Sequence, residues 1–174
     1  KTIKVPNRIV SVAWHPQRSQ LAFGVEVINE KRNVVRGTVK LLDLKTNKVK
    51  ELSWHKAGIS DLKFSPDGLL LASAGLDSKL QMWVIDHEED LPIVMDNNTG
   101  SVWDIGFTPD SNYLIASCNN GEVRIWPTDT RILAEQVCPK MQRNMTQEEW
   151  YSYVGKEKEV PYESTCKSLL IESH

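Results

Sequence analysis

The stretch Asp61-Leu-Lys-Phe-Ser-Pro-Asp-Gly68 decides the fold of this chain, because close copies of it occur on either side. The copies are Ser11-Val-Ala-Trp-His-Pro16 and Asp104-Ile-Gly-Phe-Thr-Pro-Asp-Ser111. Each copy is followed by an apolar run, a turn and a second apolar run. Two of these second runs end in a tryptophan, Trp83 and Trp126. The chain is therefore built from three related units.

The spacing of the copies is regular. Phe64 and Phe107 are 43 residues apart, and so are Trp83 and Trp126. Several short strands repeated at this period are the signature of β-propeller blades. The sequence predicts an all-β fold of four-stranded antiparallel blades, about three blades of a larger ring, with a short helical tail at the C-terminus.

The predicted propeller portion spans residues 1–130, with blades at about 8–54, 55–96 and 97–130. In the turn Ser65-Pro-Asp-Gly68, proline fixes φ early and glycine accepts a positive φ late. The motif Asn120-Gly121 is a strong hairpin signal. Trp14, Phe64 and Phe107 are expected to lie in the core of the innermost strands.

The two ends of the repeat array indicate an incomplete ring. Residues 2–5 are expected to form the outermost strand of a preceding blade, whereas the last blade lacks an outermost strand of its own. Residues 131–174 are expected to form a helical tail packed on the propeller. Helical spacing covers 132–141, and Thr146 with Glu149 forms a capping box.

Composition limits the classes of function. The chain has 174 residues and a net charge of −2, which argues against nucleic-acid binding. No apolar run is long enough to span a membrane, and no signal peptide opens the sequence. Three cysteines without a CxxC motif favour reduced thiols and a cytoplasmic location. Cys138 and Cys166 are expected to pack as thiols, in preference to a bridge or a nucleophile.

These repeats resemble the WD-repeat family of β-propellers over roughly residues 2–130. The resemblance implies a buried hydrogen-bonded tetrad, which the second unit matches in full with His55, Ser73, Asp77 and Trp83. The third unit has Asn98 and Asn120 in place of His and Asp, and keeps Ser117 and Trp126. The first unit has no clear His or Asp, and it has Leu42 in place of Trp.

The tail carries a second resemblance. Its features are Cys138, Arg143-Asn-Met-Thr146, Glu149-Trp150, Tyr153 and the run from Pro161 to Cys166. They look like the closing segment of bacterial WD-repeat signalling proteins that join a STAND-type NTPase, caspase-like or kinase region to a propeller. The resemblance implies a sensor region of such a protein. The alternatives are a free-standing scaffold and the propeller part of a hydrolase whose catalytic domain lies elsewhere.

No catalytic or cofactor site is expected within these residues. His55, Ser73 and Asp77 could suggest a hydrolase triad, but a nucleophile needs an accessible cleft and an oxyanion site. The other histidines show no metal-ligand spacing, and no glycine-rich phosphate loop is present. The expected partner is a protein or the remainder of the propeller. The position-based candidates for partner contact are Arg8, Glu30, Lys31, Arg32, Lys56, Leu76, Asn98 and Asn119.

Overall fold

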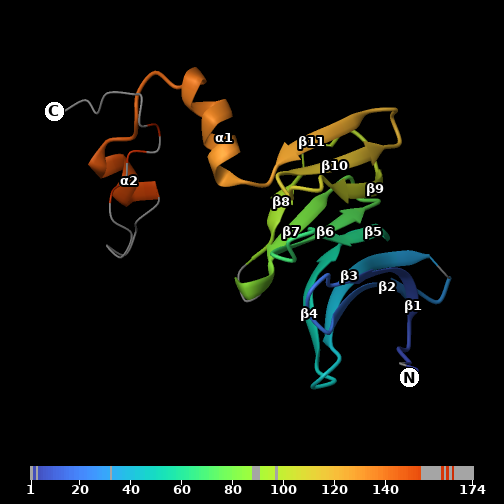
Figure 1. Ribbon diagram of the computed structural model, residues 1–174. Coiled ribbons are helices and arrows are strands. Elements are labelled where there is room, and N and C mark those ends of the chain that lie inside the picture. The colour runs from blue at the N-terminus through green and yellow to red at the C-terminus, as the bar shows by residue number, and fades with distance from the viewer. Residues whose placement is uncertain are drawn as a thin grey trace. The chain divides into compact units, whose positions relative to one another are not determined.

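The computed structural model describes residues 2, 4–31, 33–87, 91–96, 98–153, 162, 164 and 166. The chain divides into two compact units, Lys1–Trp126 and Pro127–His174. The first unit contains three antiparallel sheets, which follow one another from blue to yellow in Figure 1. This arrangement confirms the predicted fold class.

The first two sheets have four strands each, in the order β1-β2-β3-β4 and β5-β6-β7-β8. The strands of the first are β1 (Arg8–Trp14), β2 (Gln20–Ile28), β3 (Val34–Asp43) and β4 (Val49–His55). Those of the second are β5 (Ile59–Phe64), β6 (Leu70–Gly75), β7 (Leu80–Val84) and β8 (Ile93–Met95), with a 3₁₀ turn at Ile85–His87. Each strand pairs with its neighbour along the chain, as in a propeller blade.

The third sheet has three strands in the part of the chain that the structure describes. They are β9 (Val102–Phe107), β10 (Tyr113–Cys118) and β11 (Val123–Pro127), in the order β11-β10-β9. The innermost strands β1, β5 and β9 are neighbours in space, since β5 contacts both of the others. The first residues of the three repeated phrases therefore meet near one line.

Two apolar clusters join the sheets face to face. One contains Val39 and Leu41 of the first sheet with Leu62 and Trp83 of the second. The other joins the second sheet to the third through a set of buried side chains: Ala72, Ala74, Leu80, Val102, Ile105, Leu114, Ala116 and Cys118. These clusters make the three sheets one packed body.

The expectation that all three repeated aromatic residues lie in the core is wrong for Trp14. Phe64 packs against the first cluster and Phe107 against the second. Trp14 is 60% exposed, because its side of β1 faces away from the second sheet. The expected strand at residues 2–5 is also not found at Thr2, Lys4 or Val5, and Val5 instead packs beside Phe23.

His15 links the first two sheets through their turns. Its ring is 1% exposed and lies 4.9 Å from the Phe64 ring, centroid to centroid. Its Nδ1 accepts hydrogen bonds from the backbone N–H groups of Gln17 and Arg18, at 3.1 and 3.0 Å. Gly68, with φ of 75°, lies against the ring without a Cβ. Burial, and next the charge of Arg18, lower the pKa of His15, while the Gly68 backbone and Asp86 oppose the shift.

Acidification is expected to destabilise the protein through His15. A free histidine takes up a proton near pH 6.5, but the lowered pKa of His15 keeps the folded form neutral. The unfolded state then binds more protons as the pH falls below about 6.5, with a slope of up to about 1.4 kcal/mol per pH unit. Urea unfolding at about pH 7.5 and about pH 5.5 measures the loss. His15→Asn keeps an acceptor for the two N–H groups, and an undiminished pH dependence in that variant would contradict the assignment.

The C-terminal unit contains α1 (Thr130–Val137), a 3₁₀ turn at Cys138–Lys140 and α2 (Gln147–Tyr153). Within the helical spacing of residues 132–141, α1 ends at Val137, because Pro139 limits how far the helix can run. The capping box is confirmed: the Glu149 N–H donates to Thr146 Oγ1 at 3.2 Å, and the Thr146 N–H donates to Glu149 Oε2 at 2.9 Å. Of the helices described, none is both long and apolar enough to cross a membrane.

The prediction that Cys138 and Cys166 pack as thiols is wrong. The structure joins them in a disulfide with a Cα–Cα distance of 5.4 Å. The sequence could not show this, because 28 residues separate the two and the chain between them sets their approach. Cys118 is a buried free thiol of the first unit.

Candidate interaction surface

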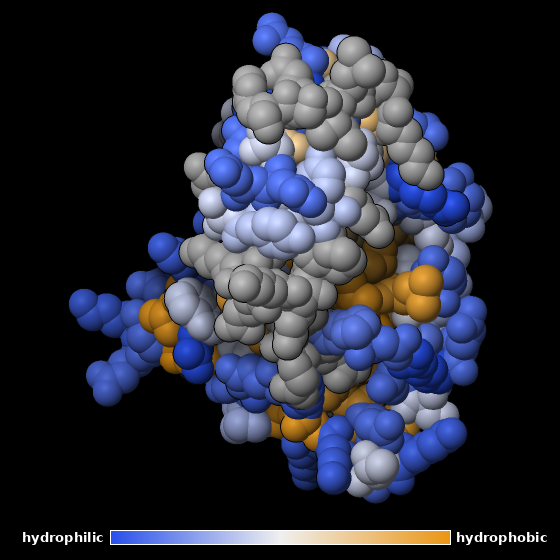
Figure 2. All heavy atoms as spheres, turned by 90° about the vertical axis from the view of Figure 1, so that its left-hand side faces the viewer, coloured by the Kyte–Doolittle hydropathy of each residue, from blue (hydrophilic) through white to orange (hydrophobic). Residues whose placement is uncertain are grey.

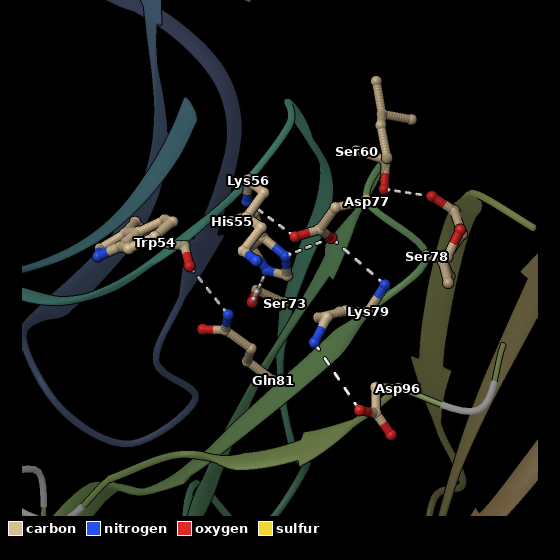
Figure 3. Close-up of polar contacts among 12 residues, drawn as sticks. Trp54, His55, Lys56, Ser60, Ser73, Asp77, Ser78, Lys79, Gln81 and Asp96 are labelled. Atoms are coloured by element: carbon tan, nitrogen blue, oxygen red, sulfur yellow. Dashed lines mark hydrogen bonds and ion pairs between the residues drawn. The ribbon is translucent and has the colours of Figure 1, made fainter. Parts of the chain in front are cut away.

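His55 is the centre of a buried polar network in the second sheet (Figure 3). Its Nδ1 lies 2.9 Å from Asp77 Oδ1, and its Nε2 lies 2.8 Å from Ser73 Oγ. A carboxylate can only accept, so in the neutral ring Nδ1 donates to Asp77 and Nε2 accepts from the Ser73 hydroxyl. The end of β4, the strand β6 and the turn before β7 are thereby held together.

Asp77 also closes the loop between β4 and β5. Its Oδ2 accepts from the Lys56 N–H at 2.8 Å, and its Oδ1 accepts from the Lys79 N–H at 3.3 Å. Burial raises the pKa of Asp77, but the hydrogen bond and charge of His55 and these backbone donors outweigh it, so the net pKa lies below its usual value. The carboxylate form is the one that the network requires.

Trp83 departs from the predicted tetrad. It lies two residues from Gln81, the register partner of Ser73, and its ring is 2% exposed in the first apolar cluster. Within the described residues its indole N–H has no hydrogen-bond partner. Gln81 instead donates to the Trp54 carbonyl at 3.0 Å (Figure 3). The polar network thus has three members, and Trp83 contributes apolar packing.

The spacing of Ser73, His55 and Asp77 matches that of a hydrolase triad, but its surroundings do not. Ser73 and His55 are both 0% exposed. A nucleophile buried in this way has no cleft through which a substrate could reach it. In the described part of the chain, no group of three His, Cys, Asp or Glu side chains could hold a metal ion.

The third blade does not repeat the network. In the second blade, Ser73 of β6 pairs with Leu62 of β5. Ile105 occupies the place of Leu62 in the third repeated phrase, and its pairing partner is Ala116. The prediction that Ser117 corresponds to Ser73 is therefore wrong by one residue. A shift of one residue moves a side chain to the other face of a strand, and Ser117 is indeed exposed. In the first blade, Phe23 takes the place of Ser73, and Leu42 takes the place of Trp83. These two side chains form an apolar cluster in place of a polar network.

Hydrogen bonds connect the loops along one side of the second and third sheets. The Leu76 N–H donates to the Gly58 carbonyl at 2.8 Å, and the Ser101 hydroxyl donates to the Leu76 carbonyl at 3.0 Å. The Asn119 N–H continues the chain of contacts to the Ser101 carbonyl at 3.0 Å. These hydrogen bonds therefore fix the loops of the second and third blades relative to one another.

Most of the predicted partner residues are exposed, and Lys56, Leu76 and Asn119 lie on or beside these loops. Leu76 is 44% exposed, and the others are exposed as well: Arg8, Glu30, Lys31, Lys56 and Asn119. Arg8 pairs with the buried carboxylate of Glu26, with Nε to Oε2 at 2.9 Å. Arg32 lies outside the described residues.

Asn98 does not belong to this surface. It is 8% exposed, and its amide donates to the carbonyls of Ser78 and Met95 at 3.0 and 3.2 Å. It fastens the loop before β9 to the second blade. The sequence did not show that the Asn98 side chain would turn to these carbonyls.

Sequence reasoning missed a cluster on the innermost strands. Asp61 accepts from the Ser11 hydroxyl at 3.3 Å and from the Ile105 N–H at 3.4 Å, and pairs with Lys63 at 2.8 Å. Burial raises the pKa of Asp61, but Lys63, Asp104 and the Leu62 N–H lower it below its usual value. The hydrogen bond with Asp61 raises the pKa of Asp104. Ser11, Asp61 and Asp104 open the three repeated phrases, and that shared position was the available signal.

Comparisons with known proteins agree with this architecture. Residues 46–84 and 91–127 match the family model described as WD domain, G-beta repeat. WD repeat and SOCS box-containing protein 1 of Homo sapiens is 30% identical over 125 residues, which cover 71% of this chain and 29% of that protein.

Two other relatives share lower identity. Protein SOF1 of Saccharomyces cerevisiae is 24% identical over 119 residues, which cover 68% of this chain and 23% of that protein. The U5 small nuclear ribonucleoprotein 40 kDa protein of Dictyostelium discoideum is 24% identical over 106 residues, which cover 61% of this chain and 30% of that protein. The chain spans less than a third of the length of these three relatives. Residues 46–84 and 91–127 are WD repeats, and the chain is similar over most of its length to eukaryotic WD-repeat proteins.

Proposed function

We propose that this chain forms part of a protein-binding WD-repeat ring and acts as the sensing region of a multidomain bacterial signalling protein. The connected loop side carries the proposal, since hydrogen bonds between blades hold Gly58, Leu76, Ser101 and Asn119 in fixed positions. Recognition residues are commonly placed on loops that a rigid scaffold positions. The signalling part rests on the tail resemblance and on the separate compact unit that the tail forms.

Two open sheet faces support further blades in the ring. Val123 and Ile125 are 68% and 61% exposed, although Leu80 and Met82, 43 residues earlier, are buried. On the first sheet Val12 and Trp14 are 59% and 60% exposed. Hydrophobic areas also reach the surface in the view of Figure 2, in orange. Apolar patches of this kind mark surfaces that another element covers.

Cysteine labelling tests whether further blades cover these faces. We expect Val12→Cys and Val123→Cys to react with maleimide at least about tenfold more slowly in the full-length natural protein than Lys31→Cys, at the exposed hairpin tip. In the 174-residue chain alone, all three positions are expected to react readily. Equal rates at the three positions of the full-length protein would refute the closed ring.

A photo-cross-linker tests the binding face. Placed at Leu76 of the full-length protein in its host cell, it is expected to give a covalent adduct of defined mass with a protein partner. The matched control is Asp110, an exposed turn residue at the opposite ends of the strands. Adducts that form equally from both positions, or from Asp110 alone, would show that the loop side is not the partner surface.

A further inference from the structure

Two bonds of different kinds converge on Cys166 in the C-terminal unit. One is the disulfide to Cys138, 28 residues earlier. The other is a pair of hydrogen bonds to the Asn144 side chain: its Nδ2 donates to the Cys166 carbonyl, and its Oδ1 accepts from the Cys166 N–H, both at 2.9 Å. The covalent bond and the amide clamp therefore fix the same residue against the turn before α2.

Apolar packing adds little to this link. α1 has no buried side chain, and among the described residues of the unit only Asn144 and Cys166 are buried. Its other contacts include an edge-to-face pair of Trp150 with Tyr162 and a hydrogen bond of 2.8 Å from the Tyr162 hydroxyl to the Met145 carbonyl. With so little apolar burial among its described residues, a covalent staple contributes much to keeping this unit closed.

The two cysteine residues differ in exposure. Cys138 is half-buried, whereas Cys166 is 5% exposed. We infer that an attacking thiolate approaches at Cys138, the more exposed residue, so that Cys166 becomes the leaving group. The geometry gives the disulfide one preferred route of reduction.

We propose that the Cys138–Cys166 disulfide is a reversible redox lock on the C-terminal unit, opened by a dithiol reductant of the Cys-x-x-Cys class. A thiolate of the reductant attacks Cys138 Sγ, the Cys138–Cys166 bond breaks, and Cys166 leaves as a thiolate that takes up a proton. The second thiol of the reductant then displaces Cys138, which leaves as a thiolate and is protonated in turn. The chain gains two electrons and two protons, and the reductant leaves as a disulfide.

Opening the lock also releases the amide clamp. Asn144 and Cys166 are 22 residues apart, and without the disulfide only non-covalent contacts, among them these two hydrogen bonds, hold that loop closed. The first unit is expected to keep its structure, since its apolar clusters do not depend on a disulfide and Cys118 is a free thiol. The proposal stands apart from the proposed partner binding, because it concerns the C-terminal unit alone.

Thiol counting and hydrogen exchange test the lock. The purified chain, alkylated under denaturing conditions, is expected to carry one modified cysteine without reductant and three after dithiothreitol. Reduction is expected to speed hydrogen exchange at the Cys166 N–H at least tenfold and to leave β5 and β6 unchanged. Oxidised glutathione is expected to restore the protection.

Two variants separate the lock from general loosening. Cys138→Ala is expected to exchange like the reduced protein with or without dithiothreitol, whereas Cys118→Ala is expected to respond to reduction like the parent chain. Three modified cysteines in the unreduced protein would overturn the proposal. Unchanged exchange at Cys166 after reduction, or protection that reoxidation does not restore, would overturn it as well.

Discussion

Replacing Gly75 by alanine is expected to lower the free energy of unfolding by about 3 kcal/mol. Gly75 ends β6 beside the buried network, and an added Cβ would fall far inside the contact distance of both Asp77 Oδ1 and His55 Nδ1. The methyl group would separate these two atoms and leave a carboxylate partly buried without its main donor. Urea unfolding of the 174-residue chain measures the loss.

Gly106→Ala is the matched control for this substitution. Gly106 also lies in a strand, β9, but a Cβ there would meet nothing within 4 Å. This variant is expected to be as stable as the parent or slightly more stable, by about 0.5 kcal/mol. His55→Ala, which removes the central ring, is expected to cost about 1–3 kcal/mol. If Gly75→Ala proved as stable as Gly106→Ala, the network would not hold the blade together.

Trp83→Ala is expected to cost about 3–5 kcal/mol, because it leaves a cavity where the first two sheets meet. Trp83 is 2% exposed and packs with Val39, Leu41 and Leu62. The stability of the joined sheets thus depends on the volume of this ring. Thermal unfolding followed by circular dichroism measures the effect.

Trp83→Phe separates packing from hydrogen bonding. Since the indole N–H has no partner among the described residues, a phenyl ring is expected to retain most of the stability, within about 1.5 kcal/mol of the parent. A four-membered network, as the family resemblance implied, would instead make the phenylalanine variant lose a buried hydrogen bond. A loss in Trp83→Phe as large as that in Trp83→Ala would favour the four-membered network.

Local signals made most of the fold predictable. The turn at Ser65 and the hairpin at Asn120-Gly121 carry residue types that specify a backbone conformation, and Gly68 and Gly121 indeed have positive φ. The strands between them alternate or form apolar runs. The repeat period then fixed the order of the strands, because each unit could be read against its neighbours.

Features that depend on contacts far apart in the sequence were not predictable. Spacing could not show the Cys138–Cys166 disulfide, because the bond depends on how the intervening chain folds. The exposure of Trp14 depends on which sheet covers β1. The error at Ser117 has a different origin. The sequence does not show whether residue 116 or residue 117 pairs with Ile105 near the end of the strand, although a shift of one residue moves a side chain to the other face of the sheet.

The meeting of Ser11, Asp61 and Asp104 bears on how a repeat chain of this kind can grow by duplication. Identical copies of the phrase would place identical charges side by side on neighbouring innermost strands, and like charges repel. Here the copies differ where they meet: one opens with serine, and only the middle copy supplies a lysine, Lys63, two residues later. Divergence between the copies thus limits the charge where they meet, and an artificial array made by repeating the third phrase unchanged, with its aspartate and no lysine two residues later, would accumulate negative charge along its axis.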